Sequence, residues 1–319
     1  MNELPEGPPP NREPPTYTRP VLGMVLVSAA ATLWALIGVC TRELEHLGIR
    51  GAEVGTWRAL IGGACFVGNY LIVRLRGTQA DRGDLVLPKT DSVAPFTNRR
   101  LLAILAAFCA VGIVLFYAAL PLAVDTGGIS LAWLLLYTAP VWVTIGSVLL
   151  LGERPGPVQW SAVVTAILGV VLLVSAIGGT VDVTVVSVSW GLLAGISYSS
   201  HYLLGRWLFV RLGAVETYAI VLPVGGIVLL AITGLTGPDS FSTVAWLVAL
   251  GVGCTFLPYL LFALGLPHIA SSRAVVVATV EPVVAVATGV VLYGERLGVI
   301  GVLGAAAVLA AAVVAGTRR

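Results

Sequence analysis

Two charged side chains lie inside stretches of sequence that are otherwise apolar. Glu281 lies near the middle of one such run and directly precedes Pro282, while Arg58 lies near the start of another. A charged side chain at the centre of a membrane helix costs at least about 2.5 kcal/mol on insertion scales, so Glu281 needs a partner or a polar cavity. The proline removes one helical hydrogen bond and frees a carbonyl oxygen near the acid. Glu281 and Pro282 therefore predict a polar pocket at mid-membrane depth, with an acid that only bridges two helices as the alternative.

Arg58 and the aromatic residues are candidates for the other walls of such a pocket. Arg58 either extends to the membrane surface, contacts an anionic group of a substrate, or pairs with Glu281. Residues 198–202, Tyr-Ser-Ser-His-Tyr, form a polar run that spreads over more than one helix face, so Tyr198 and His201 face either other helices or the pocket. Trp34 corresponds to Tyr198 when Arg42 is aligned with Arg206, and this makes it a further lining candidate.

Other chemistries have little support in the sequence. The three histidines and the four cysteines show no metal-ligand spacing, and no Cys-x-x-Cys pair occurs. We therefore expect no metal, no disulfide and no cofactor. No glycine-rich phosphate loop follows a strand, and no cluster of catalytic residues is evident, so an enzyme is not expected.

These candidate residues must be positioned by membrane helices. Hydrophobic residues make up 58% of the 319 residues and charged residues only 11%, against about 25% charged in soluble domains; mean hydropathy is +0.98. Each uncharged run is close to the roughly 20 residues that a helix needs to cross a bilayer. The predicted fold is an all-α integral membrane protein with ten transmembrane helices. They are expected at residues 20–41, 52–73, 101–121, 127–150, 157–178, 185–205, 214–234, 243–266, 271–293 and 297–316.

An internal repeat relates the two halves. Residues 111–154 recur at 253–296 with a constant offset of 142, which pairs Tyr117 with Tyr259 and Pro140 with Pro282. Five spans, an odd number, separate equivalent points, so the two five-helix repeats must be inverted relative to each other. Matched helix disruptions at Pro140 and Pro282 indicate a central site and candidate gating positions, with ordinary kinks as the alternative. The repeat also pairs Ala139 with Glu281, so the expected pocket is asymmetric.

Basic residues and composition set the expected orientation and boundaries. If the N-terminus is cytoplasmic, fourteen of the 18 basic residues fall on that side and only Arg42, Arg50 and Arg296 on the other. Both termini are therefore expected in the cytoplasm. Residues 1–20 carry seven prolines and predict a disordered tail; the repeats are expected at 21–180 and 181–317. The loop 75–100 is the only long cytoplasmic connection, and the Gly-Glu-Arg turns at 152–154 and 294–296 are interpreted as exposed short-loop anchors.

The ends of the two halves carry a family resemblance. Leu-Leu-Gly-Glu-Arg at 150–154 and Leu-Tyr-Gly-Glu-Arg at 292–296 each follow a helix with Ala-Pro or Glu-Pro and precede a Gly/Ala/Val-rich helix. The chain from about 21 to 316 resembles the EamA repeats of the drug/metabolite transporter superfamily. Arg58, Arg273, Glu281 and Pro282 also fit the family pattern, whereas Ala139 replaces a glutamate that is often present.

The resemblance implies a secondary transporter with a central cavity between the halves. Small metabolites such as amino acids are the expected cargo, with export across the bacterial cytoplasmic membrane. The expected partners are a small-molecule substrate and the lipid bilayer, with protons as a candidate coupling ion, a homodimer as a candidate assembly and no nucleic acid. An organophosphate or nucleotide-sugar exchanger is one alternative, and a non-transporting membrane sensor or membrane enzyme is another.

Overall fold

The structure is a computed structural model that describes residues 19–75, 98–177, 182–293 and 298–317. The expected disordered tail, most of the loop 75–100 and the second Gly-Glu-Arg turn lie outside these residues. The first half forms α1 (Pro20–Ala35), α2 (Ile37–His46), α3 (Gly51–Leu75), α4 (Arg99–Phe108), α5 (Phe116–Gly127), α6 (Ile129–Leu136), α7 (Ala139–Gly146) and α8 (Pro157–Ile177). The second half forms α9 (Val185–Ser200), α10 (Arg206–Arg211), α11 (Ala214–Thr233), α12 (Phe241–Val248), α13 (Leu257–Gly265), α14 (Ser271–Ala278), α15 (Val280–Tyr293) and α16 (Val299–Thr317).

These helices join into ten helical segments across the described residues, which contain no strand. The first, third, fourth, sixth, eighth and ninth segments each contain two α-helices. Eight segments are long and apolar enough to cross a membrane, and the residues Val299–Ala315 form a shorter apolar helix. The remaining segment, Val185–Arg211, contains the polar run 198–202, which lowers its mean hydropathy. The all-helical membrane fold predicted from the composition is confirmed.

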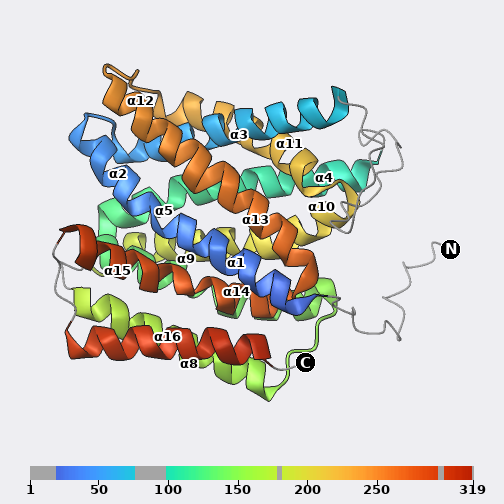
Figure 1. Cartoon of the computed structure of the whole chain (residues 1–319), viewed down its shortest axis with the longest axis vertical. Coiled ribbons are helices and arrows are strands. Elements are labelled where there is room, and N and C mark those ends of the chain that lie inside the picture. The colour runs from blue at the N-terminus through green and yellow to red at the C-terminus, as the bar shows by residue number, and fades with distance from the viewer. Residues whose placement is uncertain (1–18, 76–97, 178–181, 294–297, 318–319) are drawn as a thin grey trace.

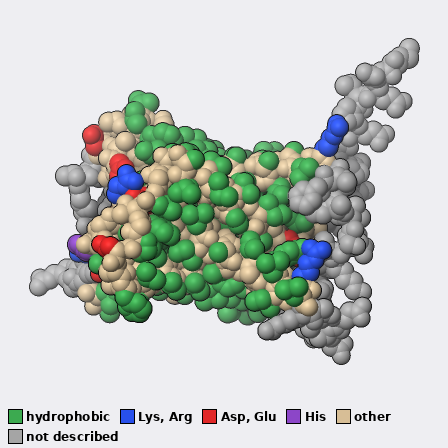
Figure 2. All heavy atoms as spheres, turned by 90° about the horizontal axis from the view of Figure 1, so that it is seen from above, with side chains coloured by type: hydrophobic (Ala, Val, Ile, Leu, Met, Phe, Trp, Pro, Cys, Tyr) green, Lys and Arg blue, Asp and Glu red, His purple; other side chains and the backbone are tan. Residues whose placement is uncertain are grey.

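The helices lie side by side and run between two ends of the molecule (Figure 1). We call the end where α1 begins and α16 ends the terminal face, and the end where α2 and α12 lie the distal face. Figure 2 shows hydrophobic side chains over the middle of one side of the molecule and charged side chains towards its two ends. This distribution suits a bilayer that surrounds the middle of the bundle.

The two halves pack as a pseudo-symmetric pair. α3 packs along α11 and α8 along α16, while α1 packs on α13 as α5 packs on α9. Exchanging the two halves leaves the α3–α11 and α8–α16 contacts unchanged, and it converts the α1–α13 contact into the α5–α9 contact. The hydroxyls of the repeat-related residues Tyr117 and Tyr259 lie 3.0 Å apart. Two equivalent residues can meet in this way only close to the axis that relates the repeats.

Close backbone approach holds α3 against α11. A Cβ atom added to Gly63 would lie 2.8 Å from the backbone nitrogen of Pro223 and 2.9 Å from its Cδ atom. A larger residue would therefore push the two helices apart. Small residues at such positions let membrane helices approach closely, so this pair is tightly fixed.

The fourth and ninth segments are interrupted at equivalent points. α6 ends at Leu136 and α7 begins at Ala139, while α14 ends at Ala278 and α15 begins at Val280. Pro140 and Pro282 therefore lie in the first turn of the helix after each break. A proline is tolerated there because the first N–H groups of a helix have no acceptor within the helix. As a result, Glu281 belongs to the first turn of a half-helix and not to the middle of a continuous one.

Candidate functional site

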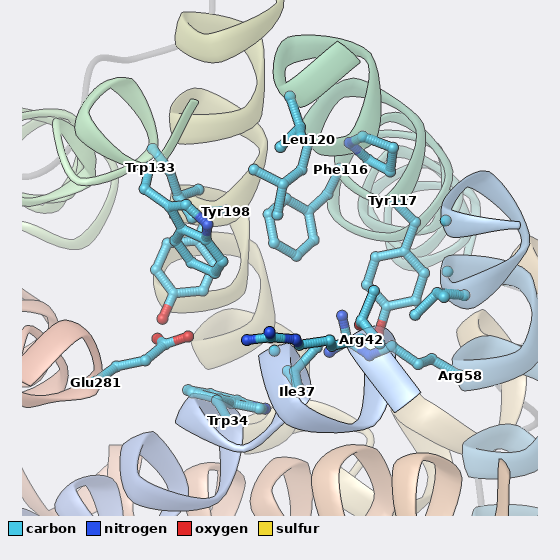
Figure 3. Close-up of a pocket in the computed structure, with 18 of the residues that line it drawn as sticks. Trp34, Ile37, Arg42, Arg58, Phe116, Tyr117, Leu120, Trp133, Tyr198 and Glu281 are labelled. Atoms are coloured by element: carbon cyan, nitrogen blue, oxygen red, sulfur yellow. The ribbon is translucent and has the colours of Figure 1, made fainter. Parts of the chain in front are cut away.

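A cavity of about 500 Å³ lies between the two halves (Figure 3). Its walls come from α1, α2, α3, α5, α6, α9, α13 and α15. At its inner end it reaches Glu281, Tyr198 and Tyr259, and it continues to Glu45, Gly51 and Asp125 near the distal face. Its size lies in the range of sites that bind small molecules.

Glu281 is held inside this cavity by the break that precedes α15. Glu281 is only 7% exposed. The Tyr198 hydroxyl lies towards the Glu281 carboxylate, and Trp34 lies below them in the view of Figure 3. The Tyr198 hydroxyl also makes a 3.0 Å hydrogen bond with the Tyr202 hydroxyl. The carboxylate is thus surrounded by aromatic rings and polar hydroxyls, at the position where the other repeat has Ala139.

Arg58 lines the opposite part of the same cavity. The residue is 8% exposed, so the expectation that it extends to the membrane surface is wrong. Its Nε atom donates to Thr255 Oγ1 at 3.3 Å, and its guanidinium carbon lies 4.8 Å from the centre of the Tyr117 ring. A cation over an aromatic face is stabilised by the ring electrons, and these contacts keep the guanidinium pointing inward.

The aromatic candidates form a continuous wall across the pseudo-symmetry axis. The Trp34 ring lies edge-on to Tyr198 and to Tyr259, with centroid distances of 6.4 and 5.5 Å. Trp34 and Tyr198 are related by the repeat, as are Tyr117 and Tyr259. The cavity therefore lies where equivalent positions of the two halves meet, which agrees with a site at the repeat interface.

His201 lies behind this wall, and it is not among the residues that line the cavity. Its Nε2 atom lies 2.9 Å from the Gly112 carbonyl oxygen, and its Nδ1 atom lies 3.3 Å from the Tyr218 hydroxyl. A carbonyl only accepts, so Nε2 carries the proton and Nδ1 accepts from Tyr218. The imidazole also stacks on Tyr259 at 5.3 Å. Its place in the structure is as support for Tyr259, because both ring nitrogens already have protein partners.

Sequence reasoning missed several residues of the cavity. Arg42 was assigned to the distal surface, but it lines the cavity and extends into it from α2 (Figure 3). Glu45, Asp125 and Trp133 are also lining residues. Arg42 and Glu45 were missed because the first segment continues beyond its expected end to His46, and Asp125 was missed because α5 continues to Gly127.

A cluster of polar residues closes the bundle at the terminal face. Gly152 and Arg154 are exposed, but Glu153 is only 6% exposed, so the interpretation of this turn as an exposed anchor is wrong for its glutamate. Its carboxylate accepts from the backbone N–H groups of Ser271 and Ser272 at 2.7 and 3.2 Å and from the Ser272 hydroxyl at 2.8 Å. Arg206 Nη1 lies 3.8 Å from Glu153 Oε1 and donates to the Ile269 carbonyl at 2.7 Å. These residues, the terminal cluster, join the end of the fourth segment to the start of α14 and to α10.

A second cluster, the distal cluster, joins the halves at the other face. Glu53 is fully buried and accepts from the Thr236 backbone N–H at 2.6 Å and from its hydroxyl at 3.0 Å. Arg50 pairs with Glu53 and donates to the Thr233 carbonyl at 2.9 Å. The start of α3 is thereby tied to the end of α11, beside the part of the cavity that reaches this face.

The fold and the cavity define a class of protein, a polytopic membrane transporter built from two related five-helix halves. Residues 21–175 and 185–317 match the EamA-like transporter family, and the chain belongs to that family. It is 28% identical over 193 residues to an uncharacterized transporter of Archaeoglobus fulgidus, covering 60% of this chain and 69% of the relative. It is 26% identical over 279 residues to the uncharacterized transporter YwfM of Bacillus subtilis, covering 86% of each.

A solved crystal structure shares the fold. It superposes with a TM-score of 0.74 at 17% identity, and the match covers 93% of this chain and 97% of the other. At this identity the likeness concerns the fold alone. The family resemblance inferred from the Gly-Glu-Arg repeats is confirmed by the match of both halves to the EamA-like transporter family.

Proposed function

We propose that this transporter moves small zwitterionic or amphiphilic metabolites, with amino acids as the leading class, by alternating access. The observation that carries the proposal is that Glu281 and Arg58 line opposite parts of one aromatic-walled cavity. A carboxylate suits an ammonium group, a guanidinium suits a carboxylate, and the rings between them suit an apolar side chain. Candidate contacts are Glu281, Arg58, Tyr198, Tyr117, Tyr259 and Trp34, with His201 acting through Tyr259.

The charges of the cavity support a zwitterion over a strongly anionic cargo. Arg42 and Arg58 contribute two positive charges, while Glu45, Asp125 and Glu281 contribute three negative ones when ionised. An organophosphate or nucleotide sugar carries several negative charges, which these carboxylates would repel. The exchanger alternative is therefore the weaker candidate.

The proposed orientation and location rest on the distribution of basic residues, and the proposed export rests on the family resemblance. Basic residues concentrate on the side of both termini, which supports a cytoplasmic terminal face in the bacterial inner membrane. The cavity then extends towards the outside, and export requires a second state that is open to the cytoplasm. Pro140 and Pro282 are candidate gating positions because each follows a helix break. Glu281 is a candidate proton site, since a carboxyl group at this depth can lose its charge on binding a proton.

Transport into proteoliposomes tests the proposal. Labelled amino acids should enter vesicles that contain the protein faster than empty vesicles, and Glu281→Gln should reduce the rate at least about tenfold by removing a charged hydrogen-bond acceptor. Glu43→Gln is a matched control on α2, outside the cavity lining, and should retain the rate. Unchanged rate and pH dependence in Glu281→Gln would exclude the role of this acid. An absence of flux across a broad substrate panel would favour the sensor or membrane-enzyme alternative.

A further inference from the structure

The terminal cluster differs in kind from a surface ion pair. Its glutamate is buried, and it accepts two backbone N–H groups at the first turn of α14. The residue before this helix, Ala270, provides no side-chain cap. Glu153 therefore acts as the cap of α14, although it belongs to the other repeat. A carboxylate at a helix N-terminus also interacts favourably with the helix dipole, and both effects are lost if the segments separate.

The contacts around Glu153 converge on the same short segment. Arg206 donates to the Ile269 carbonyl and, at 3.1 Å, to the Ser271 hydroxyl. From α8, the Gln159 side-chain amide donates to the Ser272 carbonyl at 2.6 Å. The start of α14 is thus held from three sides, and every one of these bonds must break or rearrange for it to move away.

Tyr202 contacts both the cavity wall, through its side chain, and this cluster, through its backbone. The Tyr198 hydroxyl, which lines the cavity, is bonded to the Tyr202 hydroxyl. The Tyr202 carbonyl accepts from the Ser271 hydroxyl at 2.9 Å, and the Ser271 N–H donates to Glu153. Ser271 and Ser272 of the terminal cluster also lie on the same segment as Glu281, separated from it by the break at Thr279. A change at Glu281 can therefore alter the position of α14.

We propose that Glu153, with Arg206, is the gate of the transporter at the terminal face. Its carboxylate holds α14 against the end of the fourth segment while the cavity reaches the distal face, and releasing it opens the path to the terminal face. This inference rests on the proposed alternating access. It assigns to Glu153 a positioning role, because the residue acts on α14, which precedes the half-helix α15 that carries Glu281, and does not line the cavity.

Chemical labelling of one cavity cysteine tests the gate without any knowledge of the cargo. Leu136, which lines the cavity, is replaced by cysteine in a background whose four native cysteines are changed to serine or alanine. A membrane-impermeant methanethiosulfonate reagent is then added only at the terminal face of oriented vesicles. Loss of hydrogen bonds to a charged group shifts a closed–open equilibrium by about tenfold or more, so Glu153→Gln should accelerate labelling by at least about tenfold.

Controls separate gating from loss of fold. Glu53→Gln changes the buried glutamate of the distal cluster and should leave the terminal-face labelling rate within about twofold of that of the parent protein with Leu136→Cys alone. Ser272→Ala removes only the hydroxyl bond to Glu153 and should give a smaller acceleration, which keeps the test usable if Glu153→Gln fails to fold. Unchanged or slower labelling in folded Glu153→Gln or Ser272→Ala overturns the gate, as does equal acceleration by Glu53→Gln. Failure of amino-acid transport with accelerated labelling would instead count against the proposed cargo.

Discussion

The two glutamate clusters are similar in composition and differ in what they hold. Glu53 and Glu153 both belong to the first repeat, both are buried, and both bind a backbone N–H and a hydroxyl of the second repeat. The distal cluster ties α3 to α11, whose backbones meet closely at Gly63 and Pro223. The terminal cluster ties the fourth segment to α14, a short helix that ends at a break. A similar set of bonds therefore reinforces a fixed pair in one place and restrains a separable helix in the other.

Replacing the arginine of each cluster should give the largest difference in the free energy of unfolding between the two clusters. The Arg206 side chain is 12% exposed and donates to two oxygen atoms besides its ion pair, whereas the Arg50 side chain is 64% exposed. Arg206→Gln should lower the free energy of unfolding by about 2–3 kcal/mol through lost charged hydrogen bonds. Arg50→Gln should lower it by less than about 1 kcal/mol because water replaces the exposed guanidinium. Denaturation followed in detergent measures both, and equal losses would remove the distinction between the clusters.

Features that depend on residues close together in the sequence could be predicted, whereas contacts between residues far apart in the sequence could not. The helices, the repeat and the break near Pro282 follow from local apolar runs and from proline chemistry. Tyr117, Tyr259, Trp34 and Tyr198 could be proposed as cavity residues because the repeat relates them in pairs. Glu281 could be proposed because it is a charged residue inside an apolar run. Glu153 could not, because its partners begin another helix 118 residues further along the chain. Only the packed structure shows that this acid caps that helix.

The position of Arg42 was missed for a related reason. Counting basic residues assigns a side chain to a membrane face, but it says nothing about the direction in which that side chain points. The helix is interrupted at Leu36, and Arg42 lines the cavity from α2. An interruption without a proline leaves no clear signal in an apolar helix.

The close packing of α3 against α11 can be tested by adding one methyl group at their contact. Gly63→Ala adds a methyl group that meets Pro223 at less than 3 Å, so it should destabilise the fold by about 1–3 kcal/mol. In the same helix, Gly68→Ala has no neighbour within 4 Å and should be neutral or stabilising by up to about 1 kcal/mol. Thermal unfolding of the two variants compares them directly. A Gly63→Ala variant as stable as Gly68→Ala would show that this pair tolerates separation.

The central claim is tested most directly by measuring the distance across each cluster in lipid. Pulsed electron–electron double resonance between two spin labels gives this distance. One pair of labels at Arg154 and Arg273 spans the terminal cluster, and a second pair at Ala52 and Gly237 spans the distal cluster. We expect two distance populations for the first pair, with Glu153→Gln shifting weight to the longer one, and a single population for the second. A single, unchanged distance across the terminal cluster in both proteins would contradict the proposed gate.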